Sequence, residues 1–200
     1  GNDVFEEDAA ANGNDVFNGS SGTDVVSYAS RTAGVSVTVD GVANDGDAAA
    51  GELDYVQTNV EQVVGGSGPD SLSGSSGANV LSGGPGADSL LGNGGNDVLN
   101  GGDDNDSIDG GSGADTVDGG AGDDVENGGG SNDTLVQADA PNGADTIIGG
   151  SGTDTLTYAS RTAGVAASID AVANDGAPLE GDGVDATVEN VTGGSGDDTL

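Results

Sequence analysis

The chain contains an unbroken run of nine-residue units between residues 65 and 136. Eight units follow one another in register: GGSGPDSLS, GSSGANVLS, GGPGADSLL, GNGGNDVLN, GGDDNDSID, GGSGADTVD, GGAGDDVEN and GGGSNDTLV. The sixth position of each unit is Asp or Asn, and the eighth position is aliphatic in seven of the eight units. Because a fixed period of this kind marks repeat architectures, we expect stacked turns along one continuous axis.

Each unit divides into a turn and a short strand. Gly, Asn, Asp and Ser dominate its first four positions, and these residues tolerate the positive φ of tight turns. The remaining positions can run as strand, at about 3.3 Å per residue. Two units then make one flattened coil of eighteen residues, with the eighth-position aliphatics pointing inward from both sides. The sequence therefore predicts an all-β, parallel β-solenoid with little or no helix.

The composition requires something besides a hydrophobic core. The net charge is -34, and Leu, Ile, Val and Phe together make up only 38 of 200 residues. Chains of this composition normally stay disordered, and a flexible, solvated linker is the alternative interpretation of any acidic, Gly-rich tract. The strict spacing of glycines, aspartates and aliphatics argues against that alternative. We expect a divalent cation to neutralise the acid and allow folding.

The spacing of the acidic positions favours calcium. Stacked coils lie about 4.8 Å apart, so carboxylates eighteen residues apart in sequence should lie above one another. At this distance two carboxylates repel by about 0.9 kcal/mol in water, and we do not expect the metal-free stack to form. Calcium takes oxygen ligands at about 2.3 to 2.6 Å and suits this gap, whereas Mg²⁺ requires about 2.0 to 2.1 Å and strict octahedral geometry. Metals softer than calcium, such as zinc or copper, would need Cys or His ligands, and the chain has neither.

The predicted calcium ligands are the sixth-position side chains, or their equivalents in the flanking units, and the turn carbonyls beside them. The side chains are Asp3, Asp15, Asp24, Asp70, Asn79, Asp88, Asp97, Asp106, Asp115, Asp124, Asp133, Asp145, Asp154 and Asp198. The carbonyls lie near Gly66, Gly68, Gly84, Gly86, Gly102, Gly111, Gly113, Gly120 and Gly122. Two acidic loops offer a further set, with a merely solvated loop as the equal alternative: Asp45, Glu52, Asp54, Asp175, Glu180 and Asp182.

A longer period overlies the nonapeptides and divides the chain. Residues 2–50 match residues 132–180 at an offset of 130, most closely in GSSGTDVVSYASRTAGV and GGSGTDTLTYASRTAGV. We expect one continuous solenoid in six segments. These are nonapeptide turns with a looped-out step (1–24), a β-strand insert with an acidic loop (25–64), the eight-repeat run (65–136), a second looped-out step and turn (137–154), a second insert (155–192) and the start of another run (193–200).

Five residues stand apart from the repeat pattern. Asn79 replaces Asp and should weaken the site at its coil, Glu126 replaces an inward aliphatic, and Ser75 replaces the second Gly of its unit. The only basic residues, Arg31 and Arg161, occupy equivalent points of the two inserts. Because an isolated Arg among 36 acids will find a partner, we expect each to pair with a nearby carboxylate, with a recognition patch as the alternative.

The composition also limits function. Without Cys, His or Lys there is no disulfide and no ordinary base for a Ser nucleophile, so we expect no enzyme activity. Counting leaves a glycosidase pair of carboxylates open, but the chain has no Trp on which a sugar would stack. Two basic residues are too few for nucleic-acid binding. No stretch of about 18 apolar residues is present to span a membrane.

The nonapeptide tracts resemble the calcium-binding repeat of RTX proteins, G-G-x-G-x-D-x-U-x, over roughly half of the chain. The resemblance implies a right-handed parallel β-roll with several Ca²⁺ ions between stacked turns. It also implies a fragment of a large bacterial protein that leaves the cell by type I secretion and folds on meeting extracellular calcium. The chain starts and stops within repeats, which fits a part of a longer protein.

Two functions fit this resemblance. The first is a rigid structural segment of a cell-surface, adhesive or matrix protein, with end-to-end or lateral association of copies. The second is the secretion and folding domain of an RTX enzyme or toxin whose catalytic domain lies elsewhere. The tandem 130-residue unit favours the first function, since an accessory domain usually needs only one tract.

Overall fold

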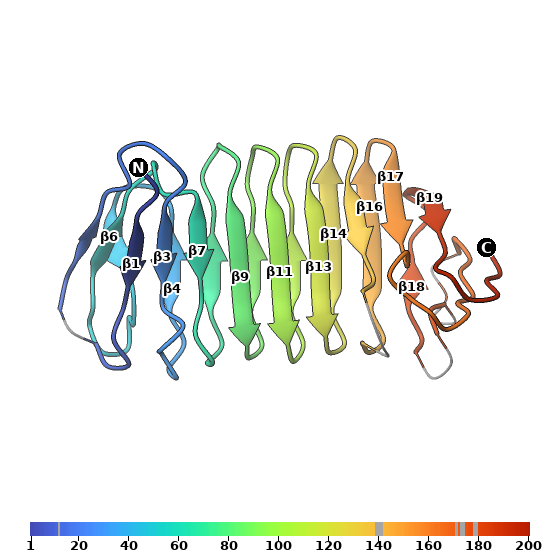
Figure 1. Cartoon of the computed structure of the whole chain (residues 1–200), viewed down its shortest axis with the longest axis horizontal. Helices are drawn as coiled ribbons and strands as arrows, with labels where there is room; N and C mark the ends of the chain where they lie inside the picture. Colours follow the sequence, from blue (N-terminus) through green and yellow to red (C-terminus); the bar gives the residue numbers. More distant parts are fainter. Residues whose placement is uncertain (12, 139–141, 171, 173–174, 178–179) are drawn as a thin grey trace.

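The computed structural model describes residues 1–11, 13–138, 142–170, 172, 175–177 and 180–200. Over these residues the chain forms a parallel β-solenoid without helix, and its strands stand side by side along one long axis (Figure 1). The N- and C-termini lie at opposite ends of that axis. The predicted all-β solenoid is confirmed. The second looped-out step, within 137–154, falls partly outside the described residues.

Two long sheets make up most of the molecule. The nine-stranded sheet has the order β1 (Val4–Glu6), β3 (Val25–Ser27), β7 (Gln62–Val64), β9 (Val80–Pro85), β11 (Val98–Asp103), β13 (Thr116–Ala121), β15 (Thr134–Val136), β17 (Asp154–Thr157) and β19 (Val188–Thr192). The seven-stranded sheet has the order β18 (Gly183–Val184), β16 (Thr146–Ser151), β14 (Val125–Gly130), β12 (Ser107–Asp109), β10 (Ser89–Leu91), β8 (Ser71–Ser73) and β4 (Ser36–Thr38). Sequential strands of the repeat run therefore alternate between the two sheets.

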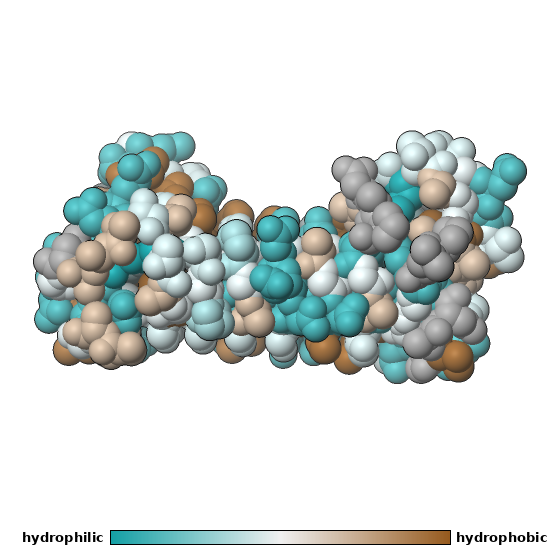
Figure 2. Space-filling view, turned by 90° about the horizontal axis from the view of Figure 1, so that it is seen from below, coloured by the Kyte–Doolittle hydropathy of each residue, from teal (hydrophilic) through white to brown (hydrophobic). Residues whose placement is uncertain are grey.

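A third, small sheet widens the N-terminal end. It consists of β2 (Val16–Phe17), β6 (Asp54–Val56) and β5 (Ala43–Asp45), and β5 runs antiparallel to β6. The first insert supplies two of these strands. Figure 2 shows the result from another side, as a narrow middle part between two wider ends.

The strand register follows the sequence period. Leu90 pairs with Ile108 and Leu99 with Val117, so one coil advances by eighteen residues, as predicted. After the eight-repeat run the advance becomes 21 residues, with Val125 opposite Thr146. The additional three residues reflect the twelve-residue step between Asp133 and Asp145.

The core of the repeat run consists of side chains that point inward from the two long sheets. Each unit of the run contributes its eighth-position residue, and seven of these are aliphatic and at most 2% exposed: Leu72, Leu81, Leu90, Leu99, Ile108, Val117 and Leu135. Their neighbours one position earlier face solvent, as Val98 does at 45% exposure. The period of two along each strand therefore separates core from surface.

The two inserts differ in regularity. In the first, Val35, Val37 and Val39 are buried around β4, in the period-two pattern of a strand with one face in the core. In the second, Val165 and Ala167 are buried, but Ile169 is 40% exposed and the segment forms only isolated bridges at Ala166. The sequence VAASI has fewer β-branched residues than VSVTV, and its strand propensity is lower.

Candidate calcium sites

The sixth-position aspartates form two hydrogen-bonded ladders along the solenoid. On one edge the Oδ1 atoms of Asp88, Asp106 and Asp124 accept the backbone N–H of the matching residue one coil earlier, at 2.7 to 2.8 Å. On the other edge Asp97, Asp115 and Asp133 do the same at 2.7 to 2.9 Å. The structure therefore brings together the rows of carboxylates that the eighteen-residue spacing predicts.

The second carboxylate oxygen of most ladder residues has no protein partner. The Oδ2 atoms that are buried without a hydrogen bond among the described residues belong to Asp24, Asp88, Asp97, Asp106, Asp115, Asp124, Asp133 and Asp154. A buried, unpartnered carboxylate oxygen is costly, since it has lost water without gaining a donor. Its recurrence in consecutive coils indicates a series of cation sites.

Glycine at the first position of each unit makes room for these oxygens. A Cβ on Gly83 would lie within 3.0 Å of both Asp88 Oδ2 and the carbonyl oxygen of Gly101 in the next coil. Gly101 has the same relation to Asp106 and Gly119. The unpartnered carboxylate oxygen and a backbone carbonyl therefore face the same space, which any side chain at this position would fill.

The turn carbonyls predicted from the sequence lie at contacts between neighbouring coils. We predicted those near the second and fourth glycines, such as Gly66 and Gly68, and their oxygens lie beneath Gly84 and Gly86 of the next coil. Carbonyls of first-position glycines, such as Gly101, also lie beside the space of the unpartnered oxygens, and the carbonyls predicted from the sequence stay predicted ligands. The sequence held a signal for this, because the first position is Gly in all eight units and the second is not.

Burial makes these aspartates hard to ionise without a cation. It raises the pKa of Asp88, Asp97 and Asp133 to about 6, although a backbone N–H donated to each works in the opposite direction. Burial raises the pKa of Asp106 to about 7, and the negative charges of Asp124 and Asp88 in the same row add to the effect. A cation between coils would remove both causes.

The donor set fits calcium. Every candidate ligand is a carboxylate or carbonyl oxygen, which calcium prefers, and the chain has no Cys or His for softer metals.

The family model of the RTX calcium-binding nonapeptide repeat matches residues 10–29, 64–99, 91–126, 100–135, 142–159 and 186–200, more than half of the chain. The chain belongs to the RTX calcium-binding repeat family. Comparison with curated proteins gave no match. No described helix is long and apolar enough to cross a membrane.

The burial and hydrogen bonding of the predicted ligands differ at the ends of the RTX ladders. Asp3 is exposed, and Asp15 and Asp198 are half-buried. Asp70 has protein partners for both oxygens, because Val35 N–H donates to Oδ1 and Gly66 N–H donates to Oδ2. These residues continue the ladder geometry without offering the same buried, free oxygen, and their role as ligands stays a prediction.

Asn79 replaces a carboxylate with an amide inside the RTX run. Its Oδ1 accepts the N–H of Ser75 at 2.8 Å, and its Nδ2 donates to the carbonyls of Val60 and Glu61 at 3.4 and 3.3 Å. The amide oxygen lies beside Gly74 and the carbonyl of Gly92, so a neutral oxygen stands where the other units have a charged, free carboxylate oxygen. This arrangement supports the prediction of a weaker site at this coil.

The acids of the two inserts lie inside the solenoid, so the interpretation of a solvated loop is wrong for Asp45, Glu52, Asp54, Asp175 and Asp182, which are all buried. Asp45 accepts the N–H groups of Thr38 and Val56 with its two oxygens. Asp54 accepts the N–H of Asp15 and the hydroxyl of Tyr28, and its counterpart Asp182 accepts those of Asp145 and Tyr158. These acids already have protein donors, and calcium at them stays a prediction.

The two arginines are interior ion-pair partners. Arg31 is 2% exposed, and its Nη2 lies 2.8 Å from both Glu7 Oε2 and Glu52 Oε1. Arg161 is 3% exposed and pairs with Glu180. The predicted ion pairs are confirmed, and the alternative of a surface recognition patch is wrong because neither guanidinium reaches the surface.

Two ladder residues, Glu61 and Glu189, were not among the ligands predicted from the sequence. Glu61 Oε2 accepts the N–H of Asp24 at 2.9 Å, and Glu189 Oε2 accepts the N–H of Asp154 at 2.7 Å. Each glutamate therefore takes the place of a sixth-position aspartate where an insert returns to the RTX ladder. Their equivalence in VEQV and VENV was the available signal.

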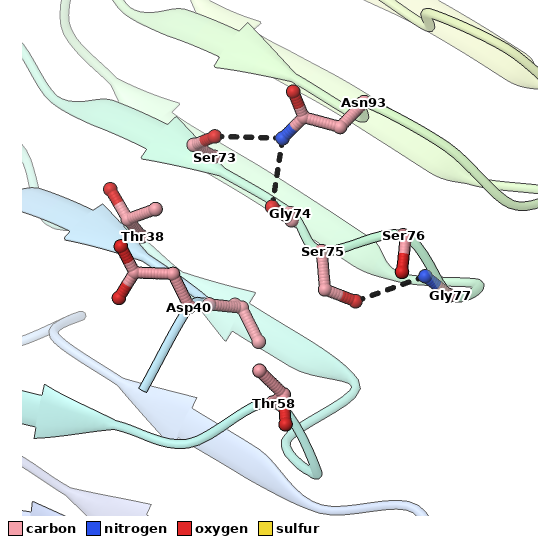
Figure 3. A pocket seen from close by; sticks show the side chains of 10 residues that line it. Thr38, Asp40, Thr58, Ser73, Gly74, Ser75, Ser76, Gly77 and Asn93 are labelled. Carbon is pink, nitrogen blue, oxygen red and sulfur yellow. Dashed lines mark hydrogen bonds between the residues drawn. The ribbon is translucent and has the colours of Figure 1, made fainter. Parts of the chain in front are cut away.

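A groove of about 770 Å³ lies on the surface between the first insert and the repeat run. Figure 3 shows that small polar side chains line it, among them Thr38, Asp40, Thr58 and Ser75. Asn93 Nδ2 donates to Ser73 Oγ at 3.0 Å and to the carbonyl of Gly74 at 2.8 Å. Asp40 is the only acidic or basic residue of the lining, which gives the groove no acid–base pair.

Proposed function

We propose that this RTX segment is a calcium-rigidified structural element of a secreted protein, used at the cell surface, in adhesion or in an extracellular matrix or filament. The observation that carries the proposal is the series of buried, unpartnered Oδ2 atoms on both edges of the solenoid. Because these atoms recur from coil to coil, the folding of the rod would depend on cations along its length and not at one local site only.

The thin core supports folding coupled to calcium. Each nonapeptide contributes one inward side chain to the core, and the net charge is -34. A metal-free chain must therefore place rows of carboxylates against one another for little apolar gain. Because the metal binds the folded chain and not the unfolded one, its binding free energy becomes folding free energy.

This dependence suits an extracellular role. RTX repeat proteins are typically secreted, and the same physics would keep the chain unfolded in a compartment low in calcium, which suits type I secretion. The two equivalent inserts joined by one rod favour a structural array over an accessory domain. We further propose that the segment itself has no enzyme activity, since its surface groove offers no catalytic pair.

Calcium removal tests the proposal directly. Far-UV circular dichroism at pH 7.5 should show a β-rich spectrum with calcium and a disordered spectrum with EGTA, and magnesium at the same concentration should not restore the structure. Small-angle scattering of the same samples should show an extended rod only with calcium. A β-rich spectrum that persists in EGTA would contradict folding on binding.

A further inference from the structure

We infer that Asp124, Glu126 and Asp145 form a three-carboxylate calcium site that extends from the ladder into the core of the solenoid. The inference rests on the proposed calcium function and assigns a ligand, Glu126, that the nonapeptide pattern does not provide. Glu126 belongs to β14 and occupies the eighth position of its unit, where the other seven units have a buried aliphatic residue.

The three side chains converge. One carboxylate oxygen from each lies within 4.8 Å of the others, and the three residues are 1%, 0% and 1% exposed. This separation leaves space for one ion in contact with all three. Three carboxylates packed this closely without a cation would repel strongly in the low-dielectric interior.

Protein donors satisfy only part of this cluster. Glu126 Oε1 accepts from Gln137 Nε2 at 2.8 Å, and Asp145 Oδ2 accepts from Asn142 Nδ2 at 3.0 Å. Glu126 Oε2 and Asp124 Oδ2 are buried with no hydrogen-bond partner among the described residues. The donors are neutral amides, so the charge of the cluster is not compensated by them.

A second acidic triad among the described residues has its charge compensated by a protein side chain. Glu7, Glu52 and Asp54 also come together, and there Arg31 forms ion pairs with both glutamates. Arg161 is the counterpart of Arg31 in the second copy, and its ion pair is with Glu180 and not with the Asp124 cluster.

Within the part of the chain that the structure describes, Arg161 contacts groups outside this cluster. Its Nη2 donates to Asn142 Oδ1 at 2.6 Å, its Nε donates to the carbonyl of Gln137, and its Nη1 pairs with Glu180. The first triad has a guanidinium as its cation, and a metal ion would fill the same role in the second.

The surroundings of Gly119 indicate how Glu126 enters the site. At Gly83 and Gly101, a Cβ would meet the free oxygen of an aspartate and a carbonyl of the next coil. At Gly119 it would meet Asp124 Oδ2 and, at 2.7 Å, Glu126 Oε1. Glu126 therefore brings a charged oxygen to a place that a neutral carbonyl occupies in the regular coils. This happens where the coil lengthens from 18 to 21 residues.

The test counts calcium ions in the whole chain by native mass spectrometry across a calcium titration. The variants are Glu126→Gln, which keeps the shape, and Glu126→Leu, which restores the aliphatic of the other units. The matched control is Glu6→Gln, the same change at an exposed glutamate. We expect both Glu126 variants to bind one ion fewer per chain at the concentration where the wild-type count reaches its plateau, and the control to match the wild type.

Equal counts and equal titration curves for wild type and both variants would overturn the inference. If the wild-type chain binds no calcium, the proposed function fails instead, which separates the two failures. Infrared spectroscopy provides a second readout, because a protonated Glu126 would give a carboxylic-acid C=O band in the calcium-loaded wild type that disappears in Glu126→Gln. We expect no such band, and its presence would equally overturn the inference.

Discussion

A sixth-position aspartate does two separate things with its two oxygens. In Asp106, Oδ1 accepts the backbone N–H of Asp88, and Oδ2 is buried without a protein partner. An asparagine can accept the first hydrogen bond but can offer only a donor or a neutral acceptor to a cation. The first function belongs to the strand ladder and the second to the metal, so a conservative substitution should separate them.

Asp106→Asn is the substitution that separates these functions. We expect the variant to fold with calcium but to need about ten- to a hundredfold more of it, since a lost charged ligand costs about 1.5 to 3 kcal/mol. Circular dichroism during a calcium titration measures the midpoint. Asp103→Asn is the control, because this residue lies in the same coil and is exposed. If both variants shift the midpoint equally, the effect is due to net charge and not to ligation.

The turns and strands of the repeat run are the elements that the sequence predicts best. Leu90 and Leu99 could be assigned to the core from sequence because the same nine-residue period sets both the strand and its neighbour in the stack. The inserts break that period. Glu61 follows Asp24 in the ladder after 37 residues, a distance that no local pattern specifies.

The interior position of the insert acids was likewise beyond the sequence. Asp54 is buried because Tyr28 and Asp15, each distant in the chain, supply its donors. Glu126 appeared only as an exception to the repeat, since its partners Asp145 and Gln137 depend on how the longer coil folds back. The sequence thus predicted the rod and its ladders. The positions of Glu61, the insert acids and Glu126 depend on contacts between distant parts of the chain.

A substitution in the turn tests how tightly the coils are stacked. Gly102 has φ +125°, and a Cβ there would lie within 3.0 Å of the carbonyl oxygen of Gly84. Gly102→Ala should destabilise the calcium-loaded chain by about 1 to 3 kcal/mol, the usual cost of such backbone strain. Thermal melting in saturating calcium measures the change.

Gly77→Ala, in the turn of another nonapeptide, is the control. The nearest atom to a Cβ at Gly77 is Ser75 Oγ at 3.6 Å, an ordinary contact. Its effect on the free energy of unfolding should stay within about 0.5 kcal/mol. Equal melting temperatures for the two alanine variants would show that the coils yield at the turn and that close stacking is not required.

Over the whole molecule, the acidic charge couples folding to both calcium and protons. Burial raises the pKa of ladder residues to between about 6 and about 8, with Asp145 at the upper end. The ordinary pKa of Asp in an unfolded chain is about 3.9. The metal-free folded chain therefore holds more protons than the unfolded chain throughout this range, and protons partly replace the missing cation.

The calcium-free chain should consequently fold better in acid. The stabilisation from the raised pKa values is complete below about pH 4 and is lost as the pH rises through about 6 to 8. Calcium binding requires the ionised carboxylates, so its affinity should change in the opposite direction and strengthen over the same range. Circular dichroism of chain freed of calcium on a chelating resin, followed from pH 8 to pH 4, should show β-structure increasing. A spectrum that stays disordered down to pH 4 would mean that protonating the ladder carboxylates does not replace the cation, and the rod would then owe its folded form to calcium alone at every pH.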